Sequence, residues 1–182
     1  MFARTPRLTL RPGWIEDAPA LTAAIAHEEV AMTLARLPWP YTLDDAQVFL
    51  GMAPAPGEAA CLILAHDQGD VPKLVGGCGI HRLGDEHEIG YWLTPDAWGR
   101  GYATEAGRAL LDIARYALGH ARLVSGHFVD NPASGRVLRR LGFTPTGRIE
   151  RRECRARGHR VPCATYTLEL GDTDAGPTRM AA

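Results

Sequence analysis

A glycine-bearing turn near the middle of the chain has residue types that could bind an anion. The segment from Trp98 to Ala103 reads WGRGYA, and it separates a run typical of a strand, Ile89–Leu93, from a helical pattern. A turn of this kind can direct several unpaired amide groups to one point, where the helix dipole adds partial positive charge. The anion that most often fits such a point is a phosphate. The sequence therefore predicts a phosphate-binding turn, with a plain strand-to-helix connection as the alternative.

Two common phosphate motifs do not describe this turn. The pattern G-x-x-x-x-G-K-[ST] does not occur, and Gly99-x-Gly101 is followed by Thr104 where a dinucleotide fingerprint has its third glycine. We therefore expect main-chain amides to bind the phosphates.

Side chains that could accept a proton lie on the strand before the turn and on its neighbours. Glu88 stands at the start of that strand, and His81 and His127 fall on adjacent predicted strands. A carboxylate or an imidazole there could take a proton from a reacting group, directly or through water. The alternatives are a solvated strand end for Glu88 and structural roles for the histidines. Because His81, His87 and His127 lack zinc-ligand spacing, we expect no metal site.

A third polar group follows the next predicted strand. Asn131-Pro132-Ala133-Ser134 is typical of a turn that starts a helix, and Gly142 ends that helix. The side chains of Asn131 and Ser134 could cap the helix, and the Ser134 hydroxyl could also donate a proton. Both roles can coexist.

The periodicity of apolar residues predicts the elements that position these groups. It predicts strands at Arg7–Arg11, Ala59–His66, Lys73–Leu83, Glu88–Leu93, Arg122–Val129, Thr144–Glu153 and Val161–Leu170. It predicts helices at Asp17–His27, Val30–Leu37, Asp44–Met52, Ala103–Ala117 and Pro132–Leu141. Asp17 is expected to cap the first helix. The order β–α–α–α–β–β–β–α–β–α–β–β indicates an α/β sandwich with a mixed sheet.

Composition limits the classes of protein to which the chain can belong. With 182 residues, 46% hydrophobic and 23% charged, the chain fits a single globular domain, 1–182, in which 171–182 is a flexible tail. The net charge of −1 gives no case for binding nucleic acid or membranes, and we expect a cytoplasmic protein without a signal peptide. The four cysteines lack C-x-x-C spacing and are expected as free buried thiols, although Cys154 and Cys163 could face each other across a hairpin.

Taken together, three separated motifs resemble the GNAT acyltransferase superfamily, and more narrowly its RimJ/RimL branch of ribosomal-protein N-acetyltransferases. The motifs are Glu88–Leu93 with Trp98–Ala106, then Asn131–Ser134, then Leu141–Phe143, and the resemblance covers Arg7 to Leu170. It implies the GNAT fold, an α/β (α+β) fold in which helices flank a mixed, mostly antiparallel central sheet. It also implies that two parallel strands splay apart and bind the pantetheine arm of acetyl-CoA.

The resemblance implies roles for individual residues. Ser134, placed as in the ribosomal-protein branch, is the candidate for protonation of the departing thiolate, and Asn131 is included in the catalytic set. Glu88 is the first choice for the general base because it enters the strand whose far end holds the thioester, and His81 and His127 are its rivals. The residues that the resemblance assigns to coenzyme A are Trp92, Leu93, Thr94, Trp98, Gly99, Arg100, Gly101, Tyr102, Ala103, Thr104, Asn131 and Ser134.

This sequence departs from the superfamily pattern at two positions. The phosphate turn usually begins with glutamine or arginine three residues before Gly101, where this chain has Trp98. Many members have a tyrosine that protonates the thiolate seven residues after the motif asparagine, where this chain has Leu138. The general acid is therefore open, and Ser134 is the candidate.

The resulting hypothesis is an N-acetyltransferase that uses acetyl-CoA as cosubstrate, without a metal, and transfers the acetyl group directly within a ternary complex. The acceptor is a protein N-terminus or a small amine, and the protein is expected as a monomer or homodimer. The alternatives are a non-catalytic coenzyme A-binding protein and a structural module. We expect the acceptor groove between the early helices and the last hairpin, lined by Trp39 and Tyr41. The arginine-rich hairpin 148–160 could bind an acidic substrate or RNA, or be merely solvated.

Overall fold

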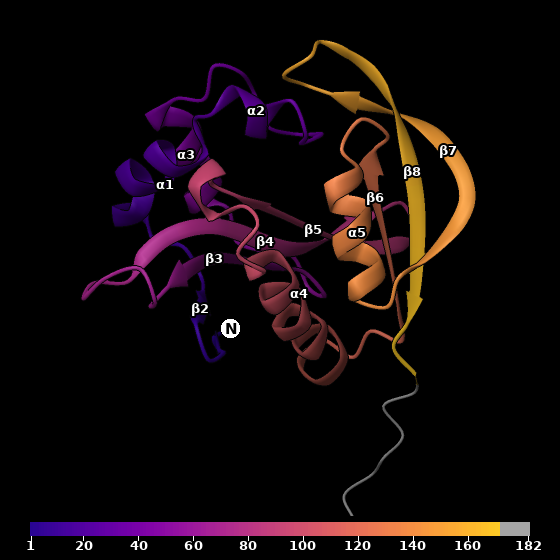
Figure 1. Cartoon of the computed structure of the whole chain (residues 1–182), viewed down its shortest axis with the longest axis horizontal. Coiled ribbons are helices and arrows are strands. Elements are labelled where there is room, and N and C mark those ends of the chain that lie inside the picture. The colour runs from indigo at the N-terminus through magenta and orange to yellow at the C-terminus, as the bar shows by residue number, and fades with distance from the viewer. Residues whose placement is uncertain (172–182) are drawn as a thin grey trace, which may run out of the picture.

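A mixed β-sheet forms the centre of the protein in a computed structural model, which describes residues 1–171 (Figure 1). In those residues eight strands follow the spatial order β1-β2-β3-β4-β5-β6-β8-β7, and only β5 and β6 pair in parallel. The strands are β1 (Ala3–Arg4), β2 (Leu8–Arg11), β3 (Ala59–Ala65), β4 (Lys73–Leu83), β5 (Glu86–Leu93), β6 (Arg122–Phe128), β7 (Thr144–Cys154) and β8 (His159–Glu169). The predicted tail lies outside the described residues, apart from Gly171.

Helices cover both faces of the sheet, and each face has its own apolar core. The helices are α1 (Ala18–Ile25), α2 (Glu28–Ala31), α3 (Leu43–Gly51), α4 (Tyr102–Asp112) and α5 (Pro132–Arg140), and α4 continues as a π-helical turn, Ile113–Ala117. Leu110 of α4 and Leu138 of α5 belong to one buried cluster, and Leu21 of α1 belongs to the other. The alternation of side chains along each strand explains why both faces are apolar.

The predicted element order is confirmed, with a short additional strand, β1, at the sheet edge. The second helix was predicted to reach Leu37, but α2 ends at Ala31. It was also predicted to begin at Val30, whereas α2 begins at Glu28. Pro38 disfavours helical backbone only at Leu37. From Met32 on, turns and bends replace the predicted helix, and the Met32 and Ala35 carbonyls accept from the hairpin instead of from a following helical turn. Asp17 does not cap α1 through its side chain. Its carboxylate instead binds Arg11, at 2.7 and 2.8 Å.

Strands β5 and β6 diverge soon after they meet. Their ladder consists of a single pair, Glu88 with Val124, and the Ser125 hydroxyl donates to the Ile89 carbonyl at 3.0 Å. Beyond that point β5 remains paired with β4 as far as Leu93, and β6 with β8. The two strands therefore form the splayed pair that the sequence analysis predicts.

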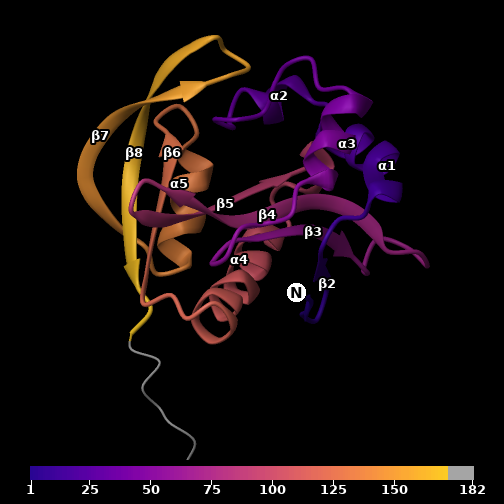
Figure 2. The same ribbon diagram turned by 180° about the vertical axis from the view of Figure 1, so that it is seen from behind.

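The β7–β8 hairpin arches over the sheet edge, and its tip contacts the segment after α2, as Figures 1 and 2 show. The Arg155 amide donates to the Ala35 carbonyl at 2.9 Å, and Arg157 Nε donates to the Met32 carbonyl at 2.8 Å. Arg157 also pairs with Asp130 at 2.6 Å. These contacts hold the hairpin tip against the early helices and leave a hollow beneath the arch.

Candidate active site

The turn between β5 and α4 presents a row of unengaged amides. Gly99 and Gly101 have φ of 74° and 82°, values that only glycine adopts at little cost. Among the described residues, no acceptor receives a hydrogen bond from the amides of Gly99–Thr104. The amide of Trp98 is engaged, because it donates to Pro95, and its indole donates to the Leu93 carbonyl at 3.0 Å. The turn can therefore present amides 99–104, at the start of α4, to an anion.

Thr94, which lies between β5 and this turn, carries a second unused donor. Its hydroxyl oxygen is buried and has no hydrogen-bond partner among the described residues, whereas its amide donates to the Val75 carbonyl at 2.9 Å. Buried hydroxyls are nearly always paired in folded proteins. A buried hydroxyl without a partner, next to the splay of β5 and β6 and to the amide row, is placed to form a hydrogen bond with a bound ligand such as coenzyme A.

Contacts from the connection between β1 and β2 brace the turn, and sequence analysis did not find them. Arg7 Nη1 donates to the Arg100 carbonyl at 3.0 Å, and the same guanidinium pairs with Glu105 of α4 at 2.6 Å. Thr5 also donates to Glu105, at 2.6 Å. Because these partners are about 100 residues apart in the chain, no local pattern identifies them.

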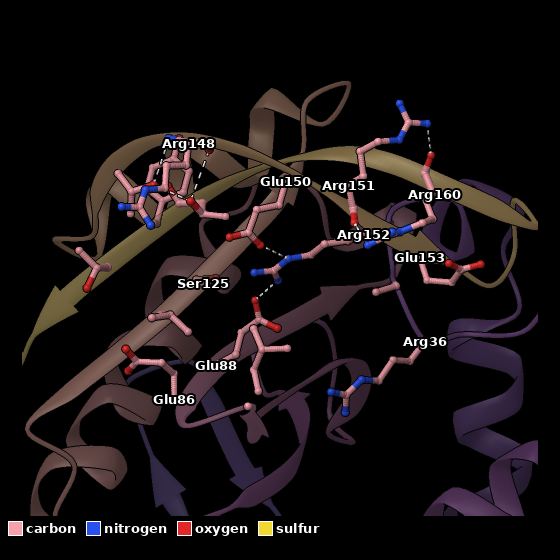
Figure 3. Close-up of a pocket in the computed structure, with 18 of the residues that line it drawn as sticks. Arg36, Glu86, Glu88, Ser125, Arg148, Glu150, Arg151, Arg152, Glu153 and Arg160 are labelled. Atoms are coloured by element: carbon pink, nitrogen blue, oxygen red, sulfur yellow. Dashed lines mark hydrogen bonds and ion pairs between the residues drawn. The ribbon is translucent and has the colours of Figure 1, made fainter.

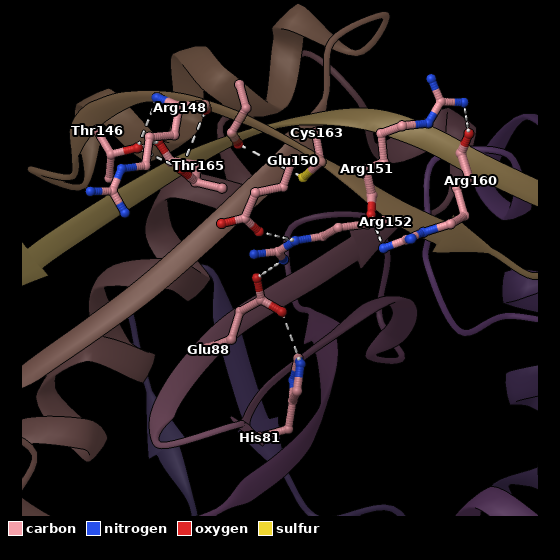
Figure 4. Close-up of polar contacts among 11 residues, drawn as sticks. His81, Glu88, Thr146, Arg148, Glu150, Arg151, Arg152, Arg160, Cys163 and Thr165 are labelled. Carbon is pink, nitrogen blue, oxygen red and sulfur yellow. Dashed lines mark hydrogen bonds and ion pairs between the residues drawn. The ribbon is translucent and has the colours of Figure 1, made fainter.

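Glu88 lies in a cavity of about 910 Å³ between the start of β5 and β6, the residues after α2, and the β7–β8 hairpin (Figure 3). Its carboxylate pairs with Arg152 on one side and with His81 Nε2, at 3.1 Å, on the other, as Figure 4 shows. Burial raises the pKa of Glu88, but hydrogen bonds and charge from His81 and Arg152 outweigh it, and the net pKa is lowered. The carboxylate is therefore ionised at neutral pH.

Ser134 faces a partner that sequence analysis missed, the phenol of Tyr91 on β5. The two hydroxyl oxygens lie 2.8 Å apart, and they join β5 to the start of α5 across the splay. Burial raises the pKa of Tyr91 to about 12, more than the hydrogen bond with Ser134 lowers it, and the phenol stays protonated. Asn131 caps α5, because its side chain accepts from the Ser134 amide at 3.4 Å.

Comparison with known proteins connects this geometry to a family. Residues 7–144 match the family described as "Acetyltransferase (GNAT) domain". A Bacillus subtilis relative, called an uncharacterized N-acetyltransferase, YoaA, is 30% identical over 146 residues, which cover 79% of this chain and 82% of that protein. This protein belongs to the GNAT acetyltransferase family.

The fold is also similar, over 93% of this chain, to the folds of solved acetyltransferase structures. A GNAT-family acetyltransferase from Bacillus anthracis has a TM-score of 0.78 at 21% identity, covering 93% of this chain and 99% of its own. RimL, a ribosomal L7/L12 alpha-N-protein acetyltransferase in complex with coenzyme A, has a TM-score of 0.75 at 20% identity, covering 93% and 98%. The predicted GNAT fold is thus confirmed.

The other candidates in this GNAT protein separate into those near Glu88 and those away from it. His81 contacts Glu88, whereas His127 contacts Tyr166, with 3.3 Å between Nε2 and the phenol oxygen. Leu138, which replaces the usual tyrosine, is fully buried in the core. Trp39 and Tyr41, predicted to line the acceptor groove, are not among the residues around the cavity. Within residues 1–171 no group of three or more potential ligands is arranged for a metal, and no helix is long and apolar enough to cross a membrane.

All four cysteines of this GNAT domain are free and buried. This confirms the prediction of free buried thiols. The alternative that Cys154 and Cys163 face each other does not hold, because Cys154 lies opposite His159 and Cys163 lies opposite Glu150. Burial raises the pKa of Cys163 to about 11. A thiol that stays protonated is a poor nucleophile.

Proposed function

We propose that the protein transfers an acetyl group from acetyl-CoA to a primary amine by direct attack within a ternary complex. The observation that carries the proposal is the unengaged amide row of Gly99–Thr104, which begins beside the splay of β5 and β6. The ionised Glu88 lies in a cavity near the start of β5. The family membership and the coenzyme A in the RimL complex support the same cosubstrate. The acceptor is a protein N-terminus, as in the RimJ/RimL branch, or a small amine.

The chain's own residues would hold the cosubstrate in two places. Amides 99–104 and the α4 dipole suit the pyrophosphate, and the orphaned hydroxyl of Thr94 suits the pantetheine arm. The family resemblance adds the main chain of Trp92 and Leu93, although the Leu93 carbonyl already accepts from the Trp98 indole. Acetyl-CoA supplies an activated acyl group, a thioester that an amine can attack. Preorganised donors at such a carbonyl contribute on the order of 10²–10³ in rate.

Transfer requires that the amine lose a proton and that the thiolate gain one. Glu88 attracts the ammonium form of the acceptor and is the group that takes its proton, directly or through water. Its lowered pKa makes it a weak base, so its negative charge contributes by binding the ammonium group as well as by accepting the proton. At the sulfur, Ser134 is the donor. Either hydroxyl of the Tyr91–Ser134 pair could be the donor. In the proposed mechanism the phenol, which stays protonated, donates to Ser134 Oγ, so that the serine proton would point toward the thiolate.

The experiment that tests the proposal measures thiol release from acetyl-CoA across a panel of amines and N-terminal peptides. Acceptor-dependent release supports acetyl transfer. Calorimetric binding of coenzyme A without release for any acceptor would favour a non-catalytic coenzyme A-binding protein, and no binding at all would reject both. Incubation with labelled acetyl-CoA, followed by denaturation, should leave no label on the protein, because the four cysteines are buried.

Removal of the Ser134 hydroxyl tests whether Ser134 is the general acid that protonates the thiolate. We expect Ser134→Ala to lower kcat about tenfold with little change in the KM for acetyl-CoA, because a positioned proton donor acts on the departing thiolate. Tyr91→Phe should lower kcat about threefold, and in a Ser134→Ala background it should have no further effect. Steady-state kinetics of the two single variants and the double variant measure this coupling. If the losses in kcat of the two single variants add in the double variant, Tyr91 does not act through Ser134.

A further inference from the structure

The cavity that contains Glu88 is lined by more cations than carboxylates. Its arginines come from the segment after α2, from β6 and from both strands of the hairpin, and they are Arg36, Arg122, Arg148, Arg151, Arg152 and Arg160. Its carboxylates are those of Glu86, Glu88, Glu150 and Glu153. The chain as a whole has a net charge of −1. The positive excess is thus a local property of this cavity.

Ion pairs neutralise only some of these arginines. Arg122 binds Glu86 at 2.8 Å, and Arg152 lies between Glu88 and Glu150. Within residues 1–171, Arg36 and Arg148 have no carboxylate within 4.0 Å.

The two remaining arginines, Arg151 and Arg160, bond each other's main chain instead of a carboxylate. Arg160 Nη2 donates to the Arg151 carbonyl at 2.6 Å, and Arg151 Nη2 donates to the Arg160 carbonyl at 2.9 Å. A carbonyl leaves the positive charge in place. In the described part of the chain, four guanidinium groups at this cavity therefore have no carboxylate within 4.0 Å, against one carboxylate, Glu153, that has no such cation.

The arginines without a nearby carboxylate lie on both sides of Glu88. Figure 3 shows Arg148 at one end of the cavity, Arg36 and Arg160 at the other, and Glu88 with Arg152 between them. Arg160 pairs in register with Glu153, five residues beyond Arg148 on β7, which is roughly 16 Å along a strand at about 3.3 Å per residue. A single carboxylate cannot contact guanidinium groups so far apart.

We propose that the acceptor is the N-terminus of an acidic peptide segment, whose amine lies at Glu88 and whose carboxylates bind Arg36, Arg148 and Arg160. This inference rests on the proposed function and names its acceptor class. The charge pattern disfavours a polyamine, which would meet like charges at both ends. It also disfavours a free amino acid, which is too short to span them. The volume of about 910 Å³ is near the upper end for small-ligand sites, and so leaves room for several residues.

The test compares three peptides of equal length that share the first residue and then carry glutamates, glutamines or lysines. We expect kcat/KM to be about tenfold higher for the acidic peptide than for the neutral one, and lower again for the basic one. Raising the ionic strength from about 0.05 M to about 0.5 M should remove most of the advantage, because the arginines are exposed.

Variants assign the preference to these arginines. The triple variant Arg36→Gln, Arg148→Gln, Arg160→Gln should lose the tenfold preference, so that its kcat/KM values for the acidic and the neutral peptide become equal. Arg4→Gln is the matched control, because β1 and β7 form opposite edges of the sheet and Arg4 does not line the cavity. It should retain the preference.

Each outcome separates this inference from the proposed function. Equal kcat/KM for the three peptides, or a preference that the triple variant retains, overturns the acidic acceptor and leaves acetyl transfer standing. If coenzyme A binds but no peptide is acetylated, the proposed function fails, and calorimetric titration of the same peptides into the complex still decides whether the arginines select acidic chains. Retention of single-stranded RNA by these arginines, without peptide discrimination, also overturns the inference.

Discussion

Glu88→Gln is expected to lower kcat/KM for the acceptor by about 10²–10³-fold while the KM for acetyl-CoA stays within a factor of two. The substitution keeps the shape of the side chain and removes the charge that attracts the ammonium group and takes its proton. The KM for acetyl-CoA is spared because Glu88 lies at the start of β5, whereas the amide row follows its far end. Steady-state kinetics with each substrate varied in turn measures both quantities. Wild-type kcat/KM in the variant would remove Glu88 from the mechanism.

The variant also breaks a partly buried ion pair, and a control must separate this structural effect. The exposed fractions of the Glu88 and Arg152 side chains are 12% and 19%, and Glu150 remains 3.5 Å from Arg152 Nε. We expect a loss of about 1–3 kcal/mol in the free energy of unfolding, measured by urea denaturation. Asp17→Asn breaks the Arg11 pair, whose side chains are 16% and 17% exposed, away from the cavity. It should lose comparable stability and keep wild-type kinetics.

The pH dependence distinguishes the roles of the carboxylate and the amine. The pKa of Glu88 is lowered from 4.5 in the folded protein, because the pairing with His81 and Arg152 outweighs burial. Its stabilising contribution is therefore complete above about pH 4.5 and is lost as the pH falls through the folded pKa. Glu88 is ionised throughout the range above that pKa, so transfer of the ammonium proton to Glu88 within the complex predicts a kcat/KM that changes little between about pH 6 and 8. A rise that persists in Glu88→Gln would instead show that the amine, whose pKa is roughly 8, loses its proton to solvent before the transfer.

Sequence patterns predicted the elements of this protein better than the contacts between them. Strand and helix order follows from apolar periodicity and from Gly142 and Pro132, which are local signals. The turn at Gly99 and Gly101 was predicted because its residue types dictate its backbone. In contrast, α2 ends at Ala31, and carbonyls beyond it accept from the β7–β8 hairpin, a contact from far along the chain that the apolar pattern does not contain; the predicted helix therefore extended too far.

The partners of the candidate site residues could not be read from the sequence. Glu88 and Arg152 are 64 residues apart, and only the arch of the hairpin brings them together. In the sequence Tyr91 is an ordinary strand residue, but in the structure its phenol lies beside Ser134, 43 residues away. Such pairs depend on sheet order and on the angle of the splay, which no local pattern encodes. The sequence thus offers residue types for the candidate site, but not the partners that set their protonation and orientation.

Gly99→Val is expected to weaken coenzyme A binding about 10–100-fold. Its φ of 74° lies in the left-handed region, where a β-branched residue costs about 1–2 kcal/mol, and relief of this strain would turn the amides of the row away from one another. Loss of one or two hydrogen bonds to a charged phosphate costs roughly 1.5–3 kcal/mol, which corresponds to that range of affinity. Calorimetric titration of coenzyme A measures it.

Gly119→Val provides the matched control for this prediction, because Gly99 and Gly119 have the same left-handed backbone conformation and the same open space around an added Cβ. Gly119 has φ of 73°, and a Cβ at either glycine would meet nothing within 4 Å. Both variants should therefore lose similar stability, measured by thermal denaturation, but only Gly99→Val should lose affinity for coenzyme A. The discriminating quantity is the ratio of the two dissociation constants. A ratio near one would mean that strain alone, and not the direction of the amides after β5, accounts for any loss, and the phosphate site would have to lie elsewhere.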